Sequence, residues 1–122
     1  MNELKIGDIF YRRLCSVDFY QIVSFTEKSV KFLHIAKEYV SRDEYNMIYK
    51  VKPVSDKVYD GKVSVRKNGV YGSADYDGKP LIKRFSSYNS VGDYFYGKHH
   101  YDSLHRYTDD IIKEDFTSAL LR

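Results

Sequence analysis

Three turn-forming pairs, Asp60-Gly61, Asn68-Gly69 and Asp77-Gly78, constrain the fold of this chain more than any other feature. Asn-Gly and Asp-Gly tolerate positive φ at both centres of a tight β-hairpin turn. The segments between the pairs carry apolar residues, namely Val63, Val65, Val70, Tyr71, Leu81 and Ile82. The sequence therefore predicts antiparallel strands, with residues 62–67 paired across Asn68-Gly69 to residues 70–74 and with Val63 and Val65 facing inward.

The N-terminal third predicts the centre of the sheet. Residues 9–14 form the first expected strand, and residues 18–26 and 29–36 form a hairpin about a tight turn at residues 26–29. Both strands of this hairpin carry apolar side chains on both faces. That pattern is typical of central or strongly curved strands, as in a small barrel.

The middle of the chain is less regular. Residues 37–46 are polar, and Ser41 to Glu44 have the spacing of a helix capping box, so we expect a loop or one short turn there. Strand character resumes at residues 47–54, where Pro53 predicts an edge or an end of the strand. A further strand is expected at residues 81–86, after the Asp77-Gly78 turn.

From residue 89 onwards the sequence changes to an arm rich in aromatic residues and histidine. Ile112, Phe116, Ala119 and Leu120 then recur at the spacing of one helix face, with Thr108 or Asp109 as the N-cap. We therefore expect one mainly β (α+β) domain: a small antiparallel β-barrel or bent sheet, SH3-like, with one C-terminal helix. Its β core would cover residues 1–88, and the arm and amphipathic helix would cover residues 89–122.

Composition limits the class of protein. At 122 residues with 30% charged side chains and one cysteine, the chain predicts a soluble domain without an internal disulfide framework. No signal-peptide pattern or apolar run of membrane length occurs, so we expect a cytoplasmic protein without membrane contact. The net charge is +3, with +5 in residues 1–91 and −2 in residues 92–122. This balance argues against an acidic DNA mimic and is compatible with contact to phosphate backbones.

Catalytic patterns are weak. His99, His100, Asp102 and His105 are the one cluster of metal-ligand types, and they would suit zinc or nickel, but their spacing matches no standard motif. Solvated loop histidines are the simpler interpretation. No nucleophile accompanies a His/Asp acid–base pair, and the glycines lie near hairpin turns instead of in a phosphate loop. We therefore expect no enzyme activity, no cofactor and no metal.

The basic strands carry more functional information. Lys62, Ser64 and Arg66 alternate onto one face, and cations interleaved with aromatic rings on an open β face are how some barrels bind single-stranded nucleic acid. A solvated face that resists edge pairing is the alternative. The predicted partner-binding residues are Lys62, Arg66, Lys67, Asn68, Tyr71, Lys83, Arg84, Tyr94, Tyr96, His99, His100 and Tyr101.

Several motifs carry a resemblance to a known family. They are residues 7–11 (GDIFY), 18–23 (DFYQIV), 26–30 (TEKSV), 51–54 (VKPV), 59–61 (YDG), 66–69 (RKNG) and 73–80 (SADYDGKP). Over about residues 7–88 the chain resembles a family of small proteins of unassigned function encoded by bacteriophages and prophages. Members often carry Trp where this chain has Tyr76.

The resemblance implies a phage-encoded accessory protein in the cytoplasm of the infected bacterial host, of the kind that often inhibits host defence. The leading expectation is a non-enzymatic, anti-CRISPR-like inhibitor that binds a host protein or nucleoprotein complex, such as a CRISPR effector. RNA or DNA contact and a homodimer are both compatible with the sequence. The alternatives are a small nucleic-acid-binding module in phage replication or transcription, and an enzyme that uses the histidine cluster.

Overall fold

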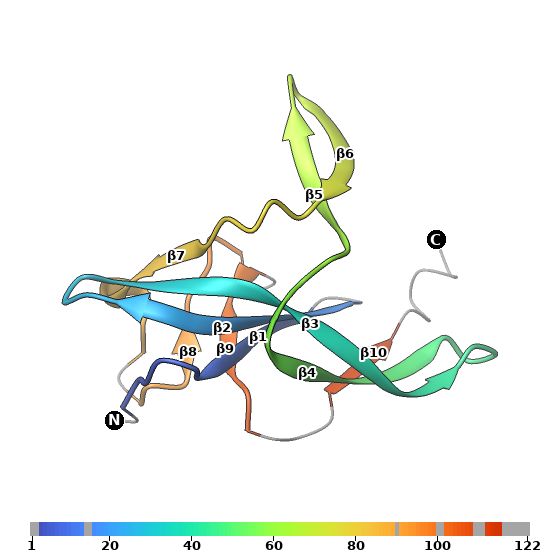
Figure 1. The fold of residues 1–122 in the computed structure, drawn as a ribbon, viewed down its shortest axis with the longest axis horizontal. Helices are drawn as coiled ribbons and strands as arrows, with labels where there is room; N and C mark the ends of the chain where they lie inside the picture. Colours follow the sequence, from blue (N-terminus) through green and yellow to red (C-terminus); the bar gives the residue numbers. More distant parts are fainter. Residues whose placement is uncertain (1–2, 14–15, 90, 100–101, 109–111, 116–122) are drawn as a thin grey trace.

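The computed structural model describes residues 3–13, 16–89, 91–99, 102–108 and 112–115, and this part is mainly β (Figure 1). One short 3₁₀ helix, η1, accompanies the strands. The elements are β1 (Ile9–Arg13), β2 (Val17–Phe25), β3 (Ser29–Asp43), β4 (Ile48–Val58), β5 (Lys62–Lys67), β6 (Val70–Asp75), β7 (Leu81–Arg84), η1 (Phe85–Ser87), β8 (Tyr94–Phe95), β9 (Leu104–Arg106) and β10 (Ile112–Asp115).

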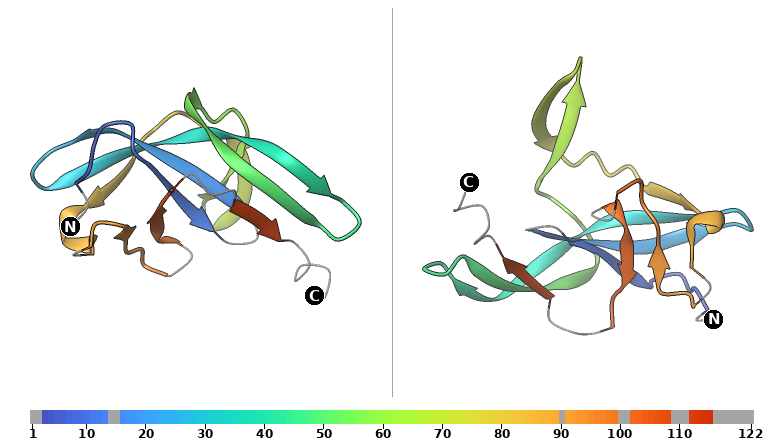
Figure 2. Two further views of the ribbon diagram at one scale, coloured as in Figure 1. Left: turned by 90° about the horizontal axis from the view of Figure 1, so that it is seen from below. Right: turned by 180° about the vertical axis from the view of Figure 1, so that it is seen from behind.

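The main sheet is antiparallel and has eight strands in the described part of the chain. Its order is β10-β4-β3-β2-β1-β9-β8, and β7 also pairs with β3. The sheet curls into a half-barrel, so that β8 and β9 run steeply across the direction of β2 and β3 (Figure 2). This confirms the prediction of a mainly β, bent antiparallel sheet, and it confirms the central hairpin.

β3 is the longest strand and shares one edge between two partners. Residues 29–32 pair with β7, and residues 35–43 pair with β4. Between these two partners the chain leaves the sheet as the β5–β6 hairpin, which forms a separate two-stranded sheet and projects from the body (Figure 1).

Two apolar cores lie on opposite faces of the β2–β3 hairpin, as the doubly apolar pattern of these two strands predicts. The larger is built around a mutual edge-to-face trio of Phe10, Phe32 and Phe95, with each pair of ring centroids 5.4 Å apart. The smaller contains Phe19 and Ile35. β8 and β9 belong to the main sheet and supply Phe95 and Leu104 to the larger core. The β core therefore extends beyond residue 88, where the sequence predicted its end.

The predicted C-terminal helix is wrong over the residues that the structure describes. Ile112–Asp115 is strand β10, which pairs with residues 48–51 of β4, and Ile112 packs against the smaller core. An open edge of β4 satisfies the backbone of this segment at once, whereas a short helix would need its own packing face. Phe116, Ala119, Leu120 and the proposed cap Asp109 lie outside the described residues.

The loop or short turn expected at residues 37–46 is wrong for residues 37–43, whereas residues 44–46 do lie in a turn. β3 continues to Asp43 and forms a long ribbon with β4, and residues 38–46 are exposed. Polar residues are what a solvated ribbon carries, so polarity alone did not separate strand from loop here. Asp43 caps the connecting turn by accepting a hydrogen bond from the backbone N–H of Asn46 at 3.1 Å. Pro53 lies just beyond the part of β4 that pairs with β10, as the edge prediction requires.

Of the three turn pairs, Asn68-Gly69 alone forms the predicted two-residue hairpin. Asn68 has φ 52° and Gly69 φ 80°, the pair of positive values that such a turn needs. At Asp77-Gly78 the glycine alone has positive φ (79°), and the strand that follows, β7, pairs with β3 and not with β6. Neither Asp60 nor Gly61 has positive φ, so this pair lies in the connection between β4 and β5 and does not form a hairpin turn.

Candidate functional site

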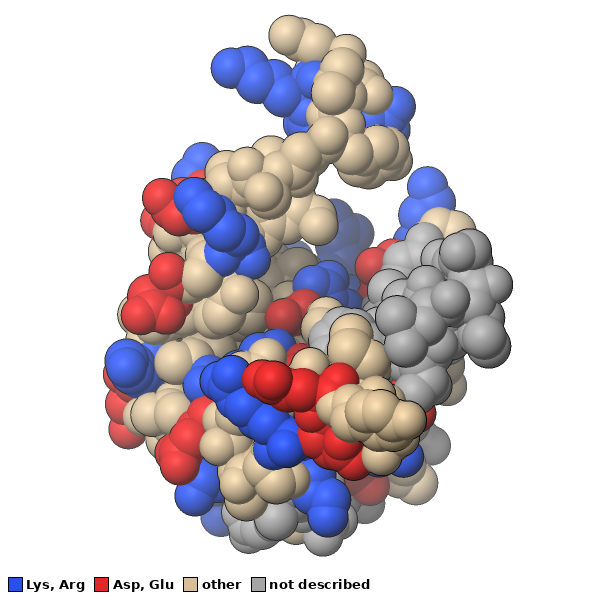
Figure 3. Space-filling model, turned by 90° about the vertical axis from the view of Figure 1, so that its right-hand side faces the viewer, with Lys and Arg blue, Asp and Glu red and all other residues tan. Residues whose placement is uncertain are grey.

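A cleft of about 550 Å³ lies between the main sheet and the base of the β5–β6 hairpin. Figure 3 shows the hollow beneath the projecting hairpin, with Lys and Arg side chains around it. We call it the His34 cleft. Its floor comes from β1, β2 and β3, and its walls come from the two segments that join the hairpin to the sheet. The residues that line the cleft include Arg12, Asp18, Tyr20, His34, Lys37, Tyr59, Lys62, Val63, Ser64, Tyr76, Asp77, Lys79, Pro80 and Leu81.

Strand register assembles the floor of the cleft. Arg12 of β1 lies opposite Asp18 of β2, and Tyr20 of β2 lies opposite His34 of β3. Asp18 and Tyr20 are two positions apart in a strand and therefore share a face. A register shift between Ile22 and Ser24 decides the last pairing, since an unbroken ladder from the turn would place His34 opposite Gln21 instead.

His34 is held inside a cage of tyrosine rings. Its imidazole stacks on Tyr59, with ring centroids 4.1 Å apart, and on Tyr20 at 4.9 Å, while Tyr76 approaches edge-on at 5.3 Å. Only 5% of the His34 side chain is exposed. The rings therefore fix the orientation of the imidazole and separate it from solvent.

Asp18 is the buried charge of the cleft. Its Oδ2 accepts a hydrogen bond from Arg12 Nη2 at 3.0 Å, while its Oδ1 lies 3.5 Å from His34 Nε2. Burial by itself would raise the pKa of Asp18, but the contacts with His34 and Arg12 outweigh it and lower that pKa to about 2. Burial likewise raises the pKa of the neighbouring Tyr20 phenol. The Asp18 carboxylate is therefore ionised throughout the ordinary pH range.

The contact between Asp18 Oδ1 and His34 Nε2 is too long for a strong hydrogen bond. His34 Nε2 is buried and has no hydrogen-bond partner among the described residues, so we treat this contact as electrostatic. An Asp/His pair has the residue types of acid–base catalysis. In this structure, however, His34 Nε2 is closed off from solvent.

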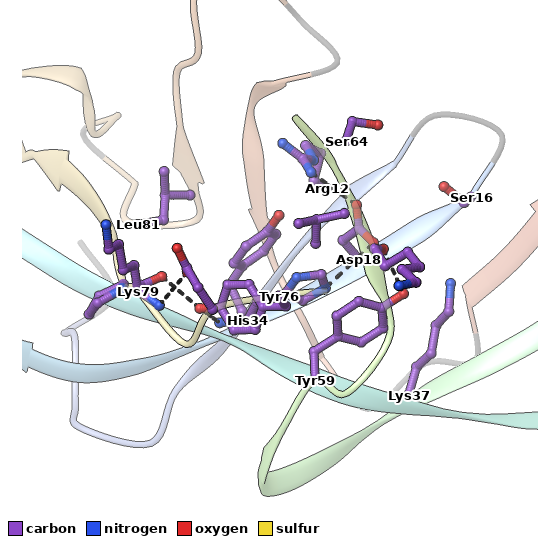
Figure 4. A pocket seen from close by; sticks show the side chains of 15 residues that line it. Arg12, Ser16, Asp18, His34, Lys37, Tyr59, Ser64, Tyr76, Lys79 and Leu81 are labelled. Atoms are coloured by element: carbon purple, nitrogen blue, oxygen red, sulfur yellow. Dashed lines mark hydrogen bonds and ion pairs between the residues drawn. The ribbon is translucent and has the colours of Figure 1, made fainter. Parts of the chain in front are cut away.

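The walls of the cleft are fixed by tyrosine hydroxyls. Tyr59 Oη donates to the carbonyl of Lys62 at 3.2 Å, and Tyr76 Oη donates to the carbonyl of Lys79 at 2.7 Å. A Cβ at Gly61 would come within 2.4 Å of the Tyr59 hydroxyl oxygen, so a larger residue there would displace the Tyr59 ring. Figure 4 shows Tyr59, Tyr76 and Lys79 around His34 and Asp18.

The second candidate surface is the β5–β6 hairpin, Lys62–Asp75, which we call the contact arm. Val70 is 70% exposed and Tyr71 75% exposed, and the Arg66 guanidinium lies 5.2 Å from the Tyr71 ring centroid. The expectation that Val63 and Val65 face a core is not met. Val63 is half-buried and Val65 is 39% exposed, because no other layer of the described residues packs on this hairpin.

The predicted partner-binding residues separate into two groups. Arg66, Lys67, Asn68 and Tyr71 lie together at the tip of the contact arm, which projects away from β7 and β8 in Figures 1 and 2. Lys62 lies at the base of the arm and pairs with Asp75 at 2.8 Å, with both side chains largely exposed.

The remaining predicted residues belong to or flank the main sheet. Lys83 and Arg84 are on β7, and burial lowers the pKa of Lys83, whose Nζ lies 3.5 Å from the carbonyl of Asp102. Tyr94 of β8 packs edge-on against Tyr96 at 4.7 Å. Tyr96 and His99 are exposed. His100 and Tyr101 lie outside the described residues.

The histidine cluster is only partly described. His105 stacks on Tyr11 and contacts Tyr94, with ring centroids 5.5 and 4.6 Å apart, and burial lowers its pKa. Among the described residues, no group of three or more His, Cys, Asp or Glu side chains is placed to hold a metal ion. His105 is therefore an exposed residue of β9 whose ring packs against Tyr11 and Tyr94.

Sequence reasoning missed most of the His34 cleft. Arg12, Asp18, His34, Tyr59 and Lys79 were not predicted as site residues. One signal was present: Asp18 and His34 are polar residues at positions where apolar neighbours in a central hairpin face the core. Locating them together required the register shift described above.

Comparisons of the chain with protein-family models, curated proteins and solved structures gave no match. Within the residues that the structure describes, no helix is both long and apolar enough to cross a membrane. The function is therefore argued from the geometry of this chain.

Proposed function

We propose that this protein acts by stoichiometric, non-enzymatic binding to a nucleoprotein complex of its host, with the contact arm as the principal contact. The observation that carries this proposal is the exposure of Val70 and Tyr71 on a hairpin that stands clear of the sheet (Figure 1). Two-stranded hairpins are marginally stable alone in water. A hairpin that exposes its apolar side chains gains stability when a partner covers them.

The charge of the contact arm indicates an acidic partner. The contact arm carries Lys62, Arg66 and Lys67 against one acidic residue, Asp75, which pairs with Lys62 at its base. Tyr and Arg are enriched among the residues that dominate binding energy, and Arg66 and Tyr71 lie side by side at the tip. A positive tip favours encounter with a phosphate backbone or an acidic protein surface.

The resemblance to phage-encoded proteins directs the proposal towards a host defence complex, such as a CRISPR effector. A stoichiometric inhibitor needs an exposed contact surface and no catalytic centre, and the contact arm supplies such a surface. The test is inhibition of purified effector nucleases at equimolar protein. One effector should lose activity with wild-type protein, and inhibition should fall when Arg66 and Tyr71 are both replaced by Ala.

A matched control removes a ring and a cation from a different exposed hairpin. Tyr45 is 94% exposed at the β3–β4 turn and Lys50 is exposed on β4, so the pair Tyr45→Ala and Lys50→Ala should leave inhibition unchanged. Equal loss in both double variants would contradict a role for the contact arm. Lack of inhibition across the panel would contradict the inhibitor function itself.

A nucleic-acid-binding module is the second candidate, because Arg66 next to Tyr71 is also a way to hold single-stranded nucleic acid. It predicts that bare oligonucleotides bind the protein with an affinity that falls steeply with salt. A pull-down from host lysate with and without nuclease separates the two functions. A protein partner that survives nuclease favours the inhibitor, whereas recovery that depends on nucleic acid favours the module.

A further inference from the structure

We propose that the His34 cleft binds a nucleoside phosphate, either free or as one unit of a single-stranded nucleic acid. The cleft, at about 550 Å³, falls within the size range of pockets for ligands of this class. The proposal concerns the floor and walls of the cleft and does not rest on the function proposed for the contact arm.

The first argument is charge: the lining of the cleft holds more cations than carboxylates, although two carboxylates outside the lining, Glu114 and Asp75, pair with Lys37 and Lys62. Four cationic side chains line the cleft against two carboxylates: Arg12, Lys37, Lys62 and Lys79 against Asp18 and Asp77. Two of the cations are engaged, Arg12 with Asp18 and Lys37 with Glu114. The ion pair of Lys62 with Asp75 is highly exposed and therefore weak.

Lys79 is the most available of the four. Its ammonium has no hydrogen bond or ion pair within the described part of the chain. Its backbone is fixed, because its N–H donates to Asp77 Oδ1 at 2.9 Å and its carbonyl accepts from Tyr76 Oη. An anchored lysine with a free ammonium at the edge of a cleft is suited to an anionic group such as phosphate.

The second argument is the apolar wall. Val63, Pro80 and Leu81 line the cleft beside the rings of Tyr59 and Tyr76. Because both tyrosine hydroxyls are tied to backbone carbonyls, the rings are already ordered before a ligand arrives. Ordered rings and apolar side chains favour a planar or apolar group at low entropic cost. Inorganic phosphate would leave this wall uncovered.

The third argument is the free acceptor on Asp18. Its Oδ2 is engaged by Arg12, while Oδ1 has only the long contact with His34 Nε2. The Asp18 side chain keeps 24% of its surface exposed, so Oδ1 can accept a hydrogen bond from a ligand. Ribose hydroxyls and the amino groups of bases are donors of the kind that a carboxylate accepts. Phosphate, a planar ring and a hydroxyl or amino donor together describe a nucleoside phosphate.

The test is a titration of isotope-labelled full-length protein followed by NMR. The probes are the four ribonucleoside monophosphates, a short single-stranded oligonucleotide and inorganic phosphate. Saturable shifts are expected at Asp18, at Lys79 and in the imidazole of His34. Saturation by monophosphates identifies a free nucleotide as the ligand, and saturation by the oligonucleotide alone identifies a strand.

Variants localise the binding. Lys79→Ala should weaken binding about tenfold, the effect of losing one charge-assisted contact to phosphate. Lys28→Ala, at an exposed turn outside the cleft, is the matched control and should bind as wild type. Ser64→Trp should fill the cleft from exposed β5 and abolish binding while the amide spectrum of the main sheet stays unchanged.

Three outcomes would overturn the proposal. They are an absence of saturable shifts with all nucleotide probes, binding of inorganic phosphate as tightly as of nucleotides, and equal weakening in Lys79→Ala and Lys28→Ala. The double variant Arg66→Ala and Tyr71→Ala should retain nucleotide binding. Failure of the contact-arm function therefore remains distinguishable from failure of the cleft.

Discussion

The carboxylate of Glu114 accepts a hydrogen bond from the backbone N–H of Val17 at 2.8 Å, across 97 positions of the chain. Glu114 is fully buried, and the same oxygen also receives the ammonium of Lys37. A buried carboxylate is tolerated only when such partners replace its water. This contact joins β10 to β2 and β3, and it explains why an acidic residue occupies an inward position in the last described strand.

Glu114→Gln should lower the free energy of unfolding by about 3 kcal/mol, because it leaves the largely buried Lys37 ammonium without its counter-charge. Urea unfolding followed by tyrosine fluorescence measures this. Replacing both residues, Lys37→Met with Glu114→Leu, should recover only part of the loss, because the buried N–H of Val17 then has no acceptor. Glu38→Gln is the control, since the Glu38–Lys52 pair is exposed and should contribute less than about 0.5 kcal/mol. Equal effects of Glu114→Gln and Glu38→Gln would contradict this account.

Asp18 should make the protein sensitive to acid. Its folded pKa, about 2, lies below the usual aspartate value of 3.8, so Asp18 contributes stability above pH 4 that is lost as the pH falls from about 4 to 2. The contribution at neutral pH is about 2 kcal/mol. Between pH 2 and pH 6 the free energy of unfolding should therefore change less with pH in Asp18→Asn than in wild type. Asp75→Asn, on an exposed carboxylate, should keep the wild-type slope.

Gly69→Ala should open the contact arm without unfolding the main sheet. A side chain at φ 80° costs about 1 kcal/mol, and that cost falls on a hairpin with no other layer to support it. Amide hydrogen exchange should accelerate at Lys67 and Val70, while the amides of β2 and β3 stay protected. Gly72→Ala is the matched control on the same hairpin, since it has no positive φ and no atom near the added Cβ. Faster exchange in both variants would point to a general loss of hairpin stability.

Arg106 should not be replaceable by lysine. Its guanidinium binds two carboxylates on different segments and lies 5.0 Å from the Phe10 ring centroid, with 16% of the side chain exposed. A lysine keeps the charge but loses the planar fork, so Arg106→Lys should cost about 2 kcal/mol by urea unfolding. Arg84→Lys on β7, which is exposed, should be neutral. The groups that accept hydrogen bonds from Arg106 are Asp8, Asp93, Tyr88 and the carbonyl of Gly92.

The parts of the fold that sequence predicts are those with local causes. The turn at Asn68-Gly69 and the hairpin about residues 26–29 both follow from residues that are adjacent in the chain. The C-terminal helix prediction failed because apolar residues four apart are equally compatible with a short strand when an open edge is near. That edge belongs to β4, more than fifty positions earlier, and no pattern near residue 112 indicates that it is there.

The cleft could not be predicted for a related reason. One extra residue between Ile22 and Ser24 moves His34 from the face of Gln21 to the face of Tyr20. A single-residue shift in a β-ladder exchanges the two faces of a strand for every residue beyond it. The residue types of the cleft were therefore visible in the sequence, but their common location depended on an irregularity that the sequence does not mark.

The segments on either side of the contact arm both hydrogen-bond to the same residue of the main sheet, His34. The backbone N–H of Tyr59 donates to the carbonyl of His34 at 3.0 Å, and the N–H of His34 donates to Tyr76 Oη at 3.3 Å. The two ends are also joined to each other, since Tyr76 N–H donates to the carbonyl of Gly61 at 3.1 Å. A segment whose two ends are joined in this way can be replaced as a unit. Its length and tip can diverge between lineages, or be redesigned to recognise a new target, while the strands that carry it keep their register.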